Sequence, residues 1–307
     1  MAVTNPNVHG NFPVIGVKYH KVFGLPVDQD IIFSNSRNKY KPRIEKRQRK
    51  LIIKIPFIRP FLDPDENILL VTTGHSPPTV FEKLGIGWFF IYLKRSLLIF
   101  TDRRIFHVPT TSKYTYRNCI AQIYYAFCES IQVKGRSLVV NYNGGEKTEK
   151  FVSLSGREKK KIGALLKIVS FADKQAGAAR RVHLCPQCAT GLNDEISDCR
   201  KCGLKFKSST VATLLAILFP GGGYFYLRQP FLGMITALLE MCAAIMIGLP
   251  VNDLINGVPS NLLWLGGGTL LLCLLKAFAV VHARVIVNEF IPRKKTINFQ
   301  TAAAMTR

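Results

Sequence analysis

The pattern of apolar and polar positions divides the chain into a strand-rich half and a strongly apolar half. Short runs rich in β-branched and aromatic residues, typical of strands, lie at 68–73, 88–93, 96–101, 104–108, 122–127, 130–134, 137–142 and 147–154. Turn sequences such as Lys134-Gly135-Arg136 and Asn143-Gly144-Gly145 separate some of them. We therefore expect residues 63–172 to form a small, partly open β-barrel with a helix at one end.

A helix is predicted at the end of this strand-rich region. Ser155 to Glu158 has the form of a helix capping box, and Ile162, Leu165, Leu166 and Val169 follow at helical spacing. The apolar stretch 84–100 also passes as a membrane span, but Lys94 and Arg95 lie inside it. A charge at mid-bilayer is expensive, so a strand pair turning at these two residues is the preferred interpretation.

Residues 1–62 lack a regular period, because glycine and proline interrupt them repeatedly. We expect a basic, irregular N-terminal arm with at most short strands. Its cations are candidates for contact with anionic lipid or a protein partner: Arg43, Lys46, Arg47, Arg49 and Lys50. Nucleic acid is the alternative partner, disfavoured because aromatic residues suited to base stacking are sparse here. Lys159, Lys160 and Lys161 join the lipid or partner candidates, with simple solvation as the alternative.

Three apolar segments make up a membrane domain at 209–290: residues 210–227, which Pro220 and three glycines interrupt, 231–250 and 262–283. The last two are long enough to span a bilayer. The loop 251–261 has no Lys or Arg, whereas both flanks are basic, which favours two spans with both flanks cytoplasmic. Segment 210–227 is then re-entrant or interfacial; three spans are the alternative. The tail 291–307 is expected on the cytoplasmic side.

Two ionisable residues lie inside these spans. Glu240 and Lys276 fall at depths that differ by about one helical turn in an antiparallel hairpin. Because isolated charges in hydrocarbon are costly, we expect an intramembrane ion pair. The alternative is a path for protons or ions.

Four cysteines between the two halves form the densest chemical motif. Cys185 and Cys188, then Cys199 and Cys202, make two Cys-x-x-Cys pairs that suit a closed tetrahedral site for structural Zn²⁺. A disulfide pair is the alternative, and it requires an oxidising compartment. A polar linker at 173–182 precedes this unit at 183–206.

Composition narrows the partners. The 307 residues carry a formal net charge of +23, which favours anionic partners. Residues 1–14 lack the features of a signal peptide, so we expect the soluble part in the cytoplasm. The six histidines are scattered, and no nucleophile has a base beside it in the sequence, so we do not expect an enzyme.

Three resemblances add to this interpretation. Residues 98–105, Leu-Ile-Phe-Thr-Asp-Arg-Arg-Ile, together with 65–69, resemble bacterial pleckstrin-homology and GRAM-like domains, which implies a lipid- or protein-docking module over 63–172. Cys-Pro-x-Cys and Cys-x-x-Cys-Gly at 185–203 resemble a bacterial zinc ribbon. Residues 218–226 with Gly233 resemble the opening of small paired-helix membrane domains.

These observations predict an α+β protein with a pleckstrin-homology-like barrel, a zinc ribbon and an α-helical membrane hairpin. We expect a membrane-anchored, non-catalytic adaptor or accessory subunit at the cytoplasmic membrane. The alternatives are a transport or channel component that uses Glu240 and Lys276, and a membrane-tethered nucleic-acid binder.

Overall fold

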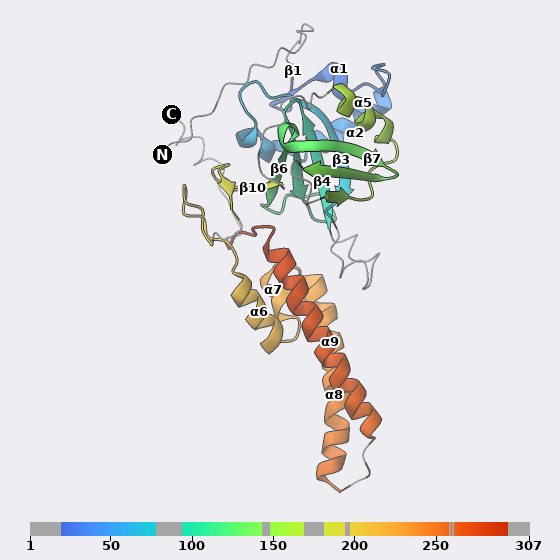
Figure 1. Ribbon diagram of the computed structural model, residues 1–307, viewed down its shortest axis with the longest axis vertical. Helices are drawn as coiled ribbons and strands as arrows, with labels where there is room; N and C mark the ends of the chain where they lie inside the picture. The colour runs from blue at the N-terminus through green and yellow to red at the C-terminus, as the bar shows by residue number, and fades with distance from the viewer. Residues whose placement is uncertain are drawn as a thin grey trace.

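The computed structural model describes residues 20–77, 94–142, 148–168, 181–193, 197–257, 259 and 261–293. The strand predicted at 88–93, the turn at 143–145, and most of the linker and tail lie outside these ranges. A strand-rich domain, called the sheet domain below, carries a long two-helix hairpin that extends away from it (Figure 1). The protein is thus of mixed α+β class.

The strands of the sheet domain form two sheets, one with strand order β1-β2-β3-β4-β5-β6-β10-β11 and one with order β7-β8-β9. The larger sheet contains β1 (His20–Val22), β2 (Leu25–Val27), β3 (Ile68–His75), β4 (Arg95–Thr101), β5 (Arg104–Pro109), β6 (Ile120–Tyr124), β10 (Val182–Leu184) and β11 (Gly191–Leu192). The smaller contains β7 (Cys128–Lys134), β8 (Ser137–Tyr142) and β9 (Thr148–Phe151). The pairing of β2 with β3 is parallel, and the others are antiparallel.

The two sheets do not close into the predicted barrel. The outer edge of β6 pairs with β10, and the short helix η2 (Tyr125–Phe127) turns the chain from β6 into β7. Elsewhere within the described residues, the end of β3 meets the residue after β9 at one isolated bridge. There the His75 and Val152 amides exchange hydrogen bonds of 2.9 and 3.2 Å. A closed barrel is therefore not confirmed, because the edge of β6 is already occupied.

The central strands of the large sheet are buried on both faces, which explains their continuous apolar runs. Along β4, Leu98 and Phe100 join a core formed with the second sheet and the helix α5 (Lys159–Ile168). Leu97 and Ile99 point to the opposite face and pack in a second core. Successive residues of a strand point to opposite faces, so two covered faces require apolar residues at every position.

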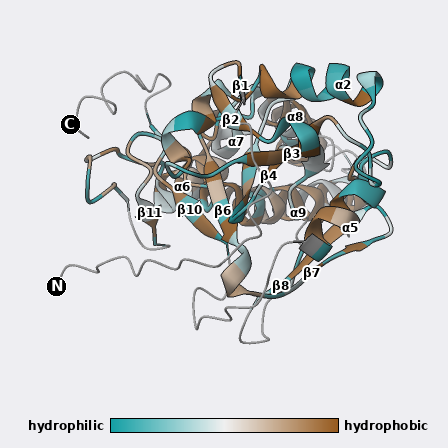
Figure 2. Ribbon diagram, turned by 90° about the horizontal axis from the view of Figure 1, so that it is seen from above, coloured by the Kyte–Doolittle hydropathy of each residue, from teal (hydrophilic) through white to brown (hydrophobic). Residues whose placement is uncertain are grey.

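The second face is covered by the N-terminal segment, so the expectation of an irregular arm is wrong for residues 20–62. This segment forms α1 (Gln29–Ile32), α2 (Pro42–Ile52) and the 3₁₀ helix η1 (Pro56–Phe61). Ile52 and Ile58 are fully buried in the second core. The amide of buried Gln48 pairs with the Val71 backbone at 3.0 and 3.1 Å, which joins α2 to β3. In Figure 2, α2 is largely hydrophilic and β3 beside it is hydrophobic.

Glu158 does not act as the predicted capping-box residue. Its buried carboxylate accepts hydrogen bonds from Gln48 (3.1 Å) and Thr72, and pairs with Arg47 at 2.7 Å. Burial raises the pKa of Glu158, although its hydrogen bond with Thr72 and the charge of Arg47 oppose this shift. The residue therefore ties α2 and β3 to the start of α5.

The Thr-Asp-x-Arg turn between β4 and β5 has a structural role of the same kind. The buried Arg104 guanidinium binds the fully buried Glu66 carboxylate at 2.6 and 2.9 Å, and Thr101 donates to the same carboxylate at 2.7 Å. The motif on which the family resemblance depends thus fastens the segment before β3 to the turn.

The apolar half forms α6 (Ser209–Leu218), α7 (Gly222–Tyr226), α8 (Pro230–Ile255) and α9 (Leu262–Val287). Only α8 and α9, among described helices, are long and apolar enough to cross a membrane. At about 1.5 Å per residue, the ten-residue α6 is too short to span. Both open ends of the α8–α9 hairpin lie at the sheet domain (Figure 1).

Candidate metal centre and membrane junction

The four predicted ligand cysteines come together through two backbone turns of the same design. The Cys185 amide donates to the Thr190 carbonyl at 2.8 Å, and the Ala189 amide donates back to the Cys185 carbonyl at 2.9 Å. Cys199 repeats this pattern with Leu204 and Gly203, at 2.9 and 2.8 Å. Ala189 and Gly203 occupy equivalent places and both have positive φ, of 58° and 68°. Each turn therefore presents its two thiols to the same point.

The sulfur positions suit one tetrahedral ion. All four Sγ atoms lie within 4.8 Å of one another, and the Cys185–Cys202 and Cys188–Cys199 pairs are 3.5 Å apart. Metal–sulfur bonds of about 2.3 Å in a tetrahedron place sulfurs about 3.8 Å apart. The four cysteines are free thiols rather than disulfides. This set can hold a metal ion, as the sequence predicts.

The thiols differ in how readily they ionise. Burial raises the pKa of the Cys185 thiol, and it also raises that of Cys202, to about 11. Burial acts in the same direction on Cys188, but hydrogen bonding by Thr190 outweighs it and lowers the pKa of Cys188 to about 7. Thiolate is the form that binds metal, so the lowered pKa of Cys188 favours metal binding by this residue.

The cysteine unit connects the sheet domain to both ends of the apolar helical region. Its first strand, β10, pairs with β6. On the other side, the Lys207 amide donates to Ile291 and the Arg293 amide donates to Lys205, both at 2.9 Å. Phe206 and Phe290 pack edge to face beside buried Cys185 and Cys199. The residues entering α6 and those leaving α9 are thus held together at this unit.

A partly buried charge cluster centred on Arg181 forms a second connection. Its guanidinium pairs with Glu149, in β9, at 3.3 Å and with Glu289, just after α9, at 3.2 Å. Burial alone raises the pKa of Glu289, but the neighbouring Arg181 charge outweighs it and holds that pKa well below its usual range. The cluster therefore binds the end of the hairpin to the sheet domain with ionised partners.

The same cluster contains a Ser–His pair that is not arranged for catalysis. His107 Nε2 lies 2.8 Å from Ser76 Oγ, and Arg181 donates to His107 Nδ1 at 2.7 Å. An arginine is always a donor, so Nδ1 accepts and Nε2 carries the proton. His107 then donates to Ser76, whereas a general base must accept from its nucleophile. Burial lowers the pKa of His107 well below its usual value, which keeps the ring neutral.

The hairpin contains the ion pair that the sequence predicts. Lys276 Nζ lies 2.9 Å from Glu240 Oε2, and it also donates to the Ala216 and Phe219 carbonyls at the end of α6, at 3.0 and 3.4 Å. Within the described residues, no donor has good hydrogen-bond geometry to either Glu240 oxygen, so this contact is ionic. Lys276 thus connects α9 to α8 and to the end of α6.

The Pro-Gly break between α6 and α7 is explained by close backbone packing. Gly221 has a φ of 63°, and a Cβ built there lies 2.1 Å from the Gly233 carbonyl of α8. Any larger residue at 221 collides with α8. On α9, only Gly268 of the three consecutive glycines faces α8 closely, with Met246 Cβ 3.0 Å from a built Cβ.

The predicted lipid- or partner-contacting cations have different environments. Lys161 is buried, and its ammonium donates to the Ile31, Ile32 and Ser34 carbonyls at 2.5, 2.8 and 2.6 Å. The expectation that it contacts a partner is therefore wrong, because it caps the end of α1. Arg47 pairs with Glu158, and Arg49 with Glu45 at 2.7 Å. The remaining cations are exposed: Arg43, Lys46, Lys50, Lys159 and Lys160.

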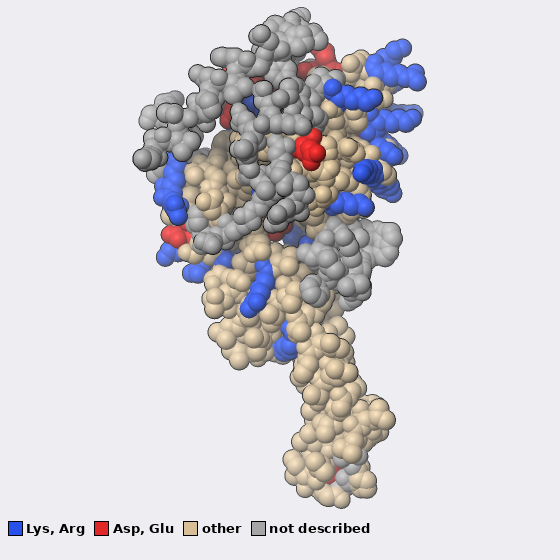
Figure 3. All heavy atoms as spheres, viewed as in Figure 1, with Lys and Arg blue, Asp and Glu red and all other residues tan. Residues whose placement is uncertain are grey.

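These exposed cations lie on the side of the sheet domain away from the hairpin. Figure 3 shows Lys and Arg gathered at the upper right, where Figure 1 places α2 and α5. Sequence reasoning found these residues but missed Arg181 and Glu289. The one sequence feature that could have indicated this pair is that a charged residue lies on each side of the apolar half.

Comparisons of the chain with models of known families, with curated proteins and with solved structures find no match. The family resemblances carried by residues 98–105, 185–203 and 218–233 therefore stay predictions. The function must be argued from the geometry of the chain itself.

Proposed function

We propose that this chain is a non-catalytic, membrane-anchored docking protein that binds an acidic segment of a protein partner. The observation that supports this proposal is a groove beside α2, which is lined by cationic and apolar residues. Arg47, Lys50 and Lys54 line it together with Leu51 and Ile53, and Ile53 is 59% exposed. A partner with acidic residues around one apolar side chain complements this surface.

The position of α2 supports a protein rather than a lipid partner. This helix, whose Arg47 and Lys50 line the groove, lies on the side of the sheet domain away from the α8–α9 hairpin (Figure 1). A bilayer that holds the hairpin then faces the opposite end of the domain. The sequence-predicted lipid contacts around Arg43 to Lys50 are therefore better suited to a protein that approaches from the solvent.

In this proposal the α8–α9 hairpin is the membrane anchor, and the four-cysteine site connects this anchor to the sheet domain. Hairpin α8–α9 spans the cytoplasmic membrane, with the sheet domain and both termini on the cytoplasmic side, because the basic residues gather at that end. Four thiolates fill the coordination sphere of Zn²⁺, so the ion is structural and holds the anchor to the sheet domain. We interpret the sheet domain as an open variant of the pleckstrin-homology or GRAM-like design.

The ion pair in the hairpin favours this proposal over transport. The Lys276 ammonium is held by Glu240 and two α6 carbonyls, which are contacts that fix helices. The tautomer of His107 likewise supports a non-catalytic role for the Ser76–His107 pair.

The test is to purify the full chain from gently solubilised native membranes and to quantify co-purifying proteins by mass spectrometry. The groove variant is Lys50→Glu/Lys54→Glu, and the control carries the same charge change at exposed Lys134 and Lys150. We expect at least a tenfold loss of a stoichiometric acidic partner with the groove variant alone. Equal recovery of that partner with both variants, or no such partner, contradicts the proposal.

A further inference from the structure

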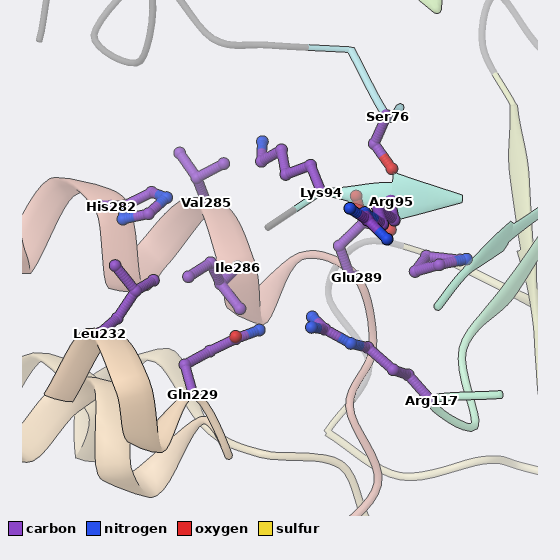
Figure 4. A pocket seen from close by; sticks show the side chains of 11 residues that line it. Ser76, Lys94, Arg95, Arg117, Gln229, Leu232, His282, Val285, Ile286 and Glu289 are labelled. Carbon is purple, nitrogen blue, oxygen red and sulfur yellow. The ribbon is translucent and has the colours of Figure 1, made fainter. Parts of the chain in front are cut away.

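A second pocket, with its own lining residues, lies where the sheet domain meets the hairpin. One wall comes from the sheet domain and includes Lys94, Arg95 and Arg117 (Figure 4). The opposite wall comes from the first turn of α8 and the last turns of α9, and includes Leu232 and Ile286. The cavity has a volume of about 50 Å³, which is room for a few water-sized groups.

The charge of the described lining is strongly unbalanced. The lining contains the cations Lys94, Arg95 and Arg117 but a single carboxylate, Glu289, which Arg181 already pairs at 3.2 Å. The Arg95 guanidinium donates to the Ser112 carbonyl at 2.7 Å and lies over the Tyr114 ring. Within the described part of the chain, no carboxylate lies within ion-pair distance of the Arg117 guanidinium. That guanidinium points into the pocket, toward Gln229 and Ile286 (Figure 4). Burial lowers the pKa of Arg117, although the charge of Glu289 acts in the opposite direction.

The depth of the pocket matches the headgroup region of a bilayer. It includes Gln229, which precedes α8, while Phe231 and Met234 just beyond are 52% and 61% exposed apolar residues. On α9, the exposed Arg284 lies next to the lining residue Val285. The cationic wall is therefore at the level where the hairpin passes from water into hydrocarbon.

We propose that this pocket binds the phosphate group of an anionic phospholipid. Arg117 and Lys94 contact the phosphate, and the apolar wall of Leu232, Val285 and Ile286 receives the glycerol and the start of the acyl chains. Arginine suits this role because its planar fork can donate two parallel hydrogen bonds to phosphate oxygens. The inference rests on the membrane anchoring proposed above, but not on the partner-binding groove.

The experiment measures lipid binding to the detergent-purified full chain by native mass spectrometry and isothermal titration calorimetry. The probes are dihexanoyl phosphatidylglycerol, dihexanoyl phosphatidylcholine and inorganic phosphate. We compare wild type with Arg117→Gln and Lys94→Gln, and use Arg103→Gln as a control, because Arg103 is 46% exposed and lies on a different turn. Wild type and control should bind phosphatidylglycerol at least tenfold more tightly than either pocket variant.

The outcomes separate this inference from the anchoring proposal. Equal phosphatidylglycerol binding by wild type and by both pocket variants overturns the pocket. Inorganic phosphate binding as tightly as phosphatidylglycerol overturns the lipid as the source of the phosphate. Membrane fractionation gives the independent readout, since Arg117→Gln should remain in the membrane fraction. Release of the wild-type chain from membranes by high salt or carbonate overturns the anchoring instead. Two pocket variants guard against one that fails to fold, which a thermal melt detects.

Discussion

The sheet domain and the hairpin both bury carboxylates, but they stabilise them differently. Glu66 and Glu158 in the sheet domain each meet several donors, from arginine and threonine side chains among others. Glu240 in the hairpin, 2% exposed, meets one cation at 2.9 Å. A buried carboxylate is costly unless it is paired and hydrogen-bonded, and the two acids of the sheet domain meet this demand with several donors. The acid of the hairpin meets it with one cation, the kind of partner expected for an ionisable residue on an apolar helix.

The surfaces of the two regions differ in the same way. The sheet domain buries apolar residues on both faces of its large sheet and exposes cations. The hairpin exposes large apolar side chains such as Leu238, Leu263 and Leu270, at 63%, 84% and 63%. The two regions therefore present opposite surfaces, cationic on the sheet domain and apolar on the hairpin. The metal centre and the Arg181 cluster lie where the two meet.

Removing the metal should have the largest effect, because it disconnects the two regions. Structural zinc contributes about 10–16 kcal/mol to the folding of small zinc-dependent peptides. We expect one zinc ion per wild-type chain by elemental analysis and none in Cys199→Ser/Cys202→Ser. Limited trypsin digestion should then cut the variant within residues 197–207, while the sheet domain stays intact.

Cys242→Ser/Cys273→Ser is the matched control, since it also removes two thiols, both from exposed positions in the hairpin. It should keep its metal and its protease resistance. Metal content that survives in the Cys199/Cys202 variant would falsify the four-cysteine site.

Removing Arg181 tests whether the junction depends on a complete donor shell. Arg181→Met leaves Glu289 and Glu149 without their shared cation, and breaking a buried pair costs about 3–5 kcal/mol. Because the glutamates are 22% and 20% exposed, we expect about 3 kcal/mol, measured by denaturant unfolding of the full chain in detergent.

The matched control for this change is Arg103→Met. Its pair with Asp63 spans 3.5 Å and both side chains are more than 40% exposed, so about 0–1 kcal/mol is expected. Equal losses for the two variants contradict a special role of the Arg181 cluster. Adding Glu289→Met to Arg181→Met should recover part of the loss.

Much of the fold was predictable where the signal is local. The strands β3, β4, β5 and β8, the turn at Gly135, the four cysteines and the two long helices follow from short patterns. The Glu240–Lys276 pair was also predictable, because an antiparallel hairpin fixes which depths face each other.

The rest depends on contacts between distant parts of the chain. Gln48 binds Val71, Lys161 caps α1 and Arg181 reaches Glu289, across 23, 129 and 108 residues. A lysine that caps a buried helix has the same local sequence as one in solvent, which is why Lys161 was misassigned. The uninterrupted apolar run 68–71 indicates the covering role of residues 20–62, because a strand that is apolar at every position must be covered on both faces.

The smallest expected effects concern the hairpin, and they are unequal for the two partners. Lys276→Met leaves Glu240 unpaired and also removes the donor to the Ala216 and Phe219 carbonyls. Glu240→Gln removes only the negative charge, and Lys276 keeps its bonds to α6. We expect about 2–3 kcal/mol for Lys276→Met, comparable to an ionisable group at mid-bilayer, and about 1 kcal/mol for Glu240→Gln.

The double variant Glu240→Gln/Lys276→Met decides whether one partner suffices for a buried acid in the hairpin. If Glu240 is held by Lys276 alone, removing its charge makes the loss of Lys276 less harmful, so the double variant should be more stable than Lys276→Met. Thermal unfolding of the full chain in lipid nanodiscs measures the difference. Additive losses would mean that Glu240 and Lys276 act independently, and the contrast with the multi-donor acids of the sheet domain would then not hold.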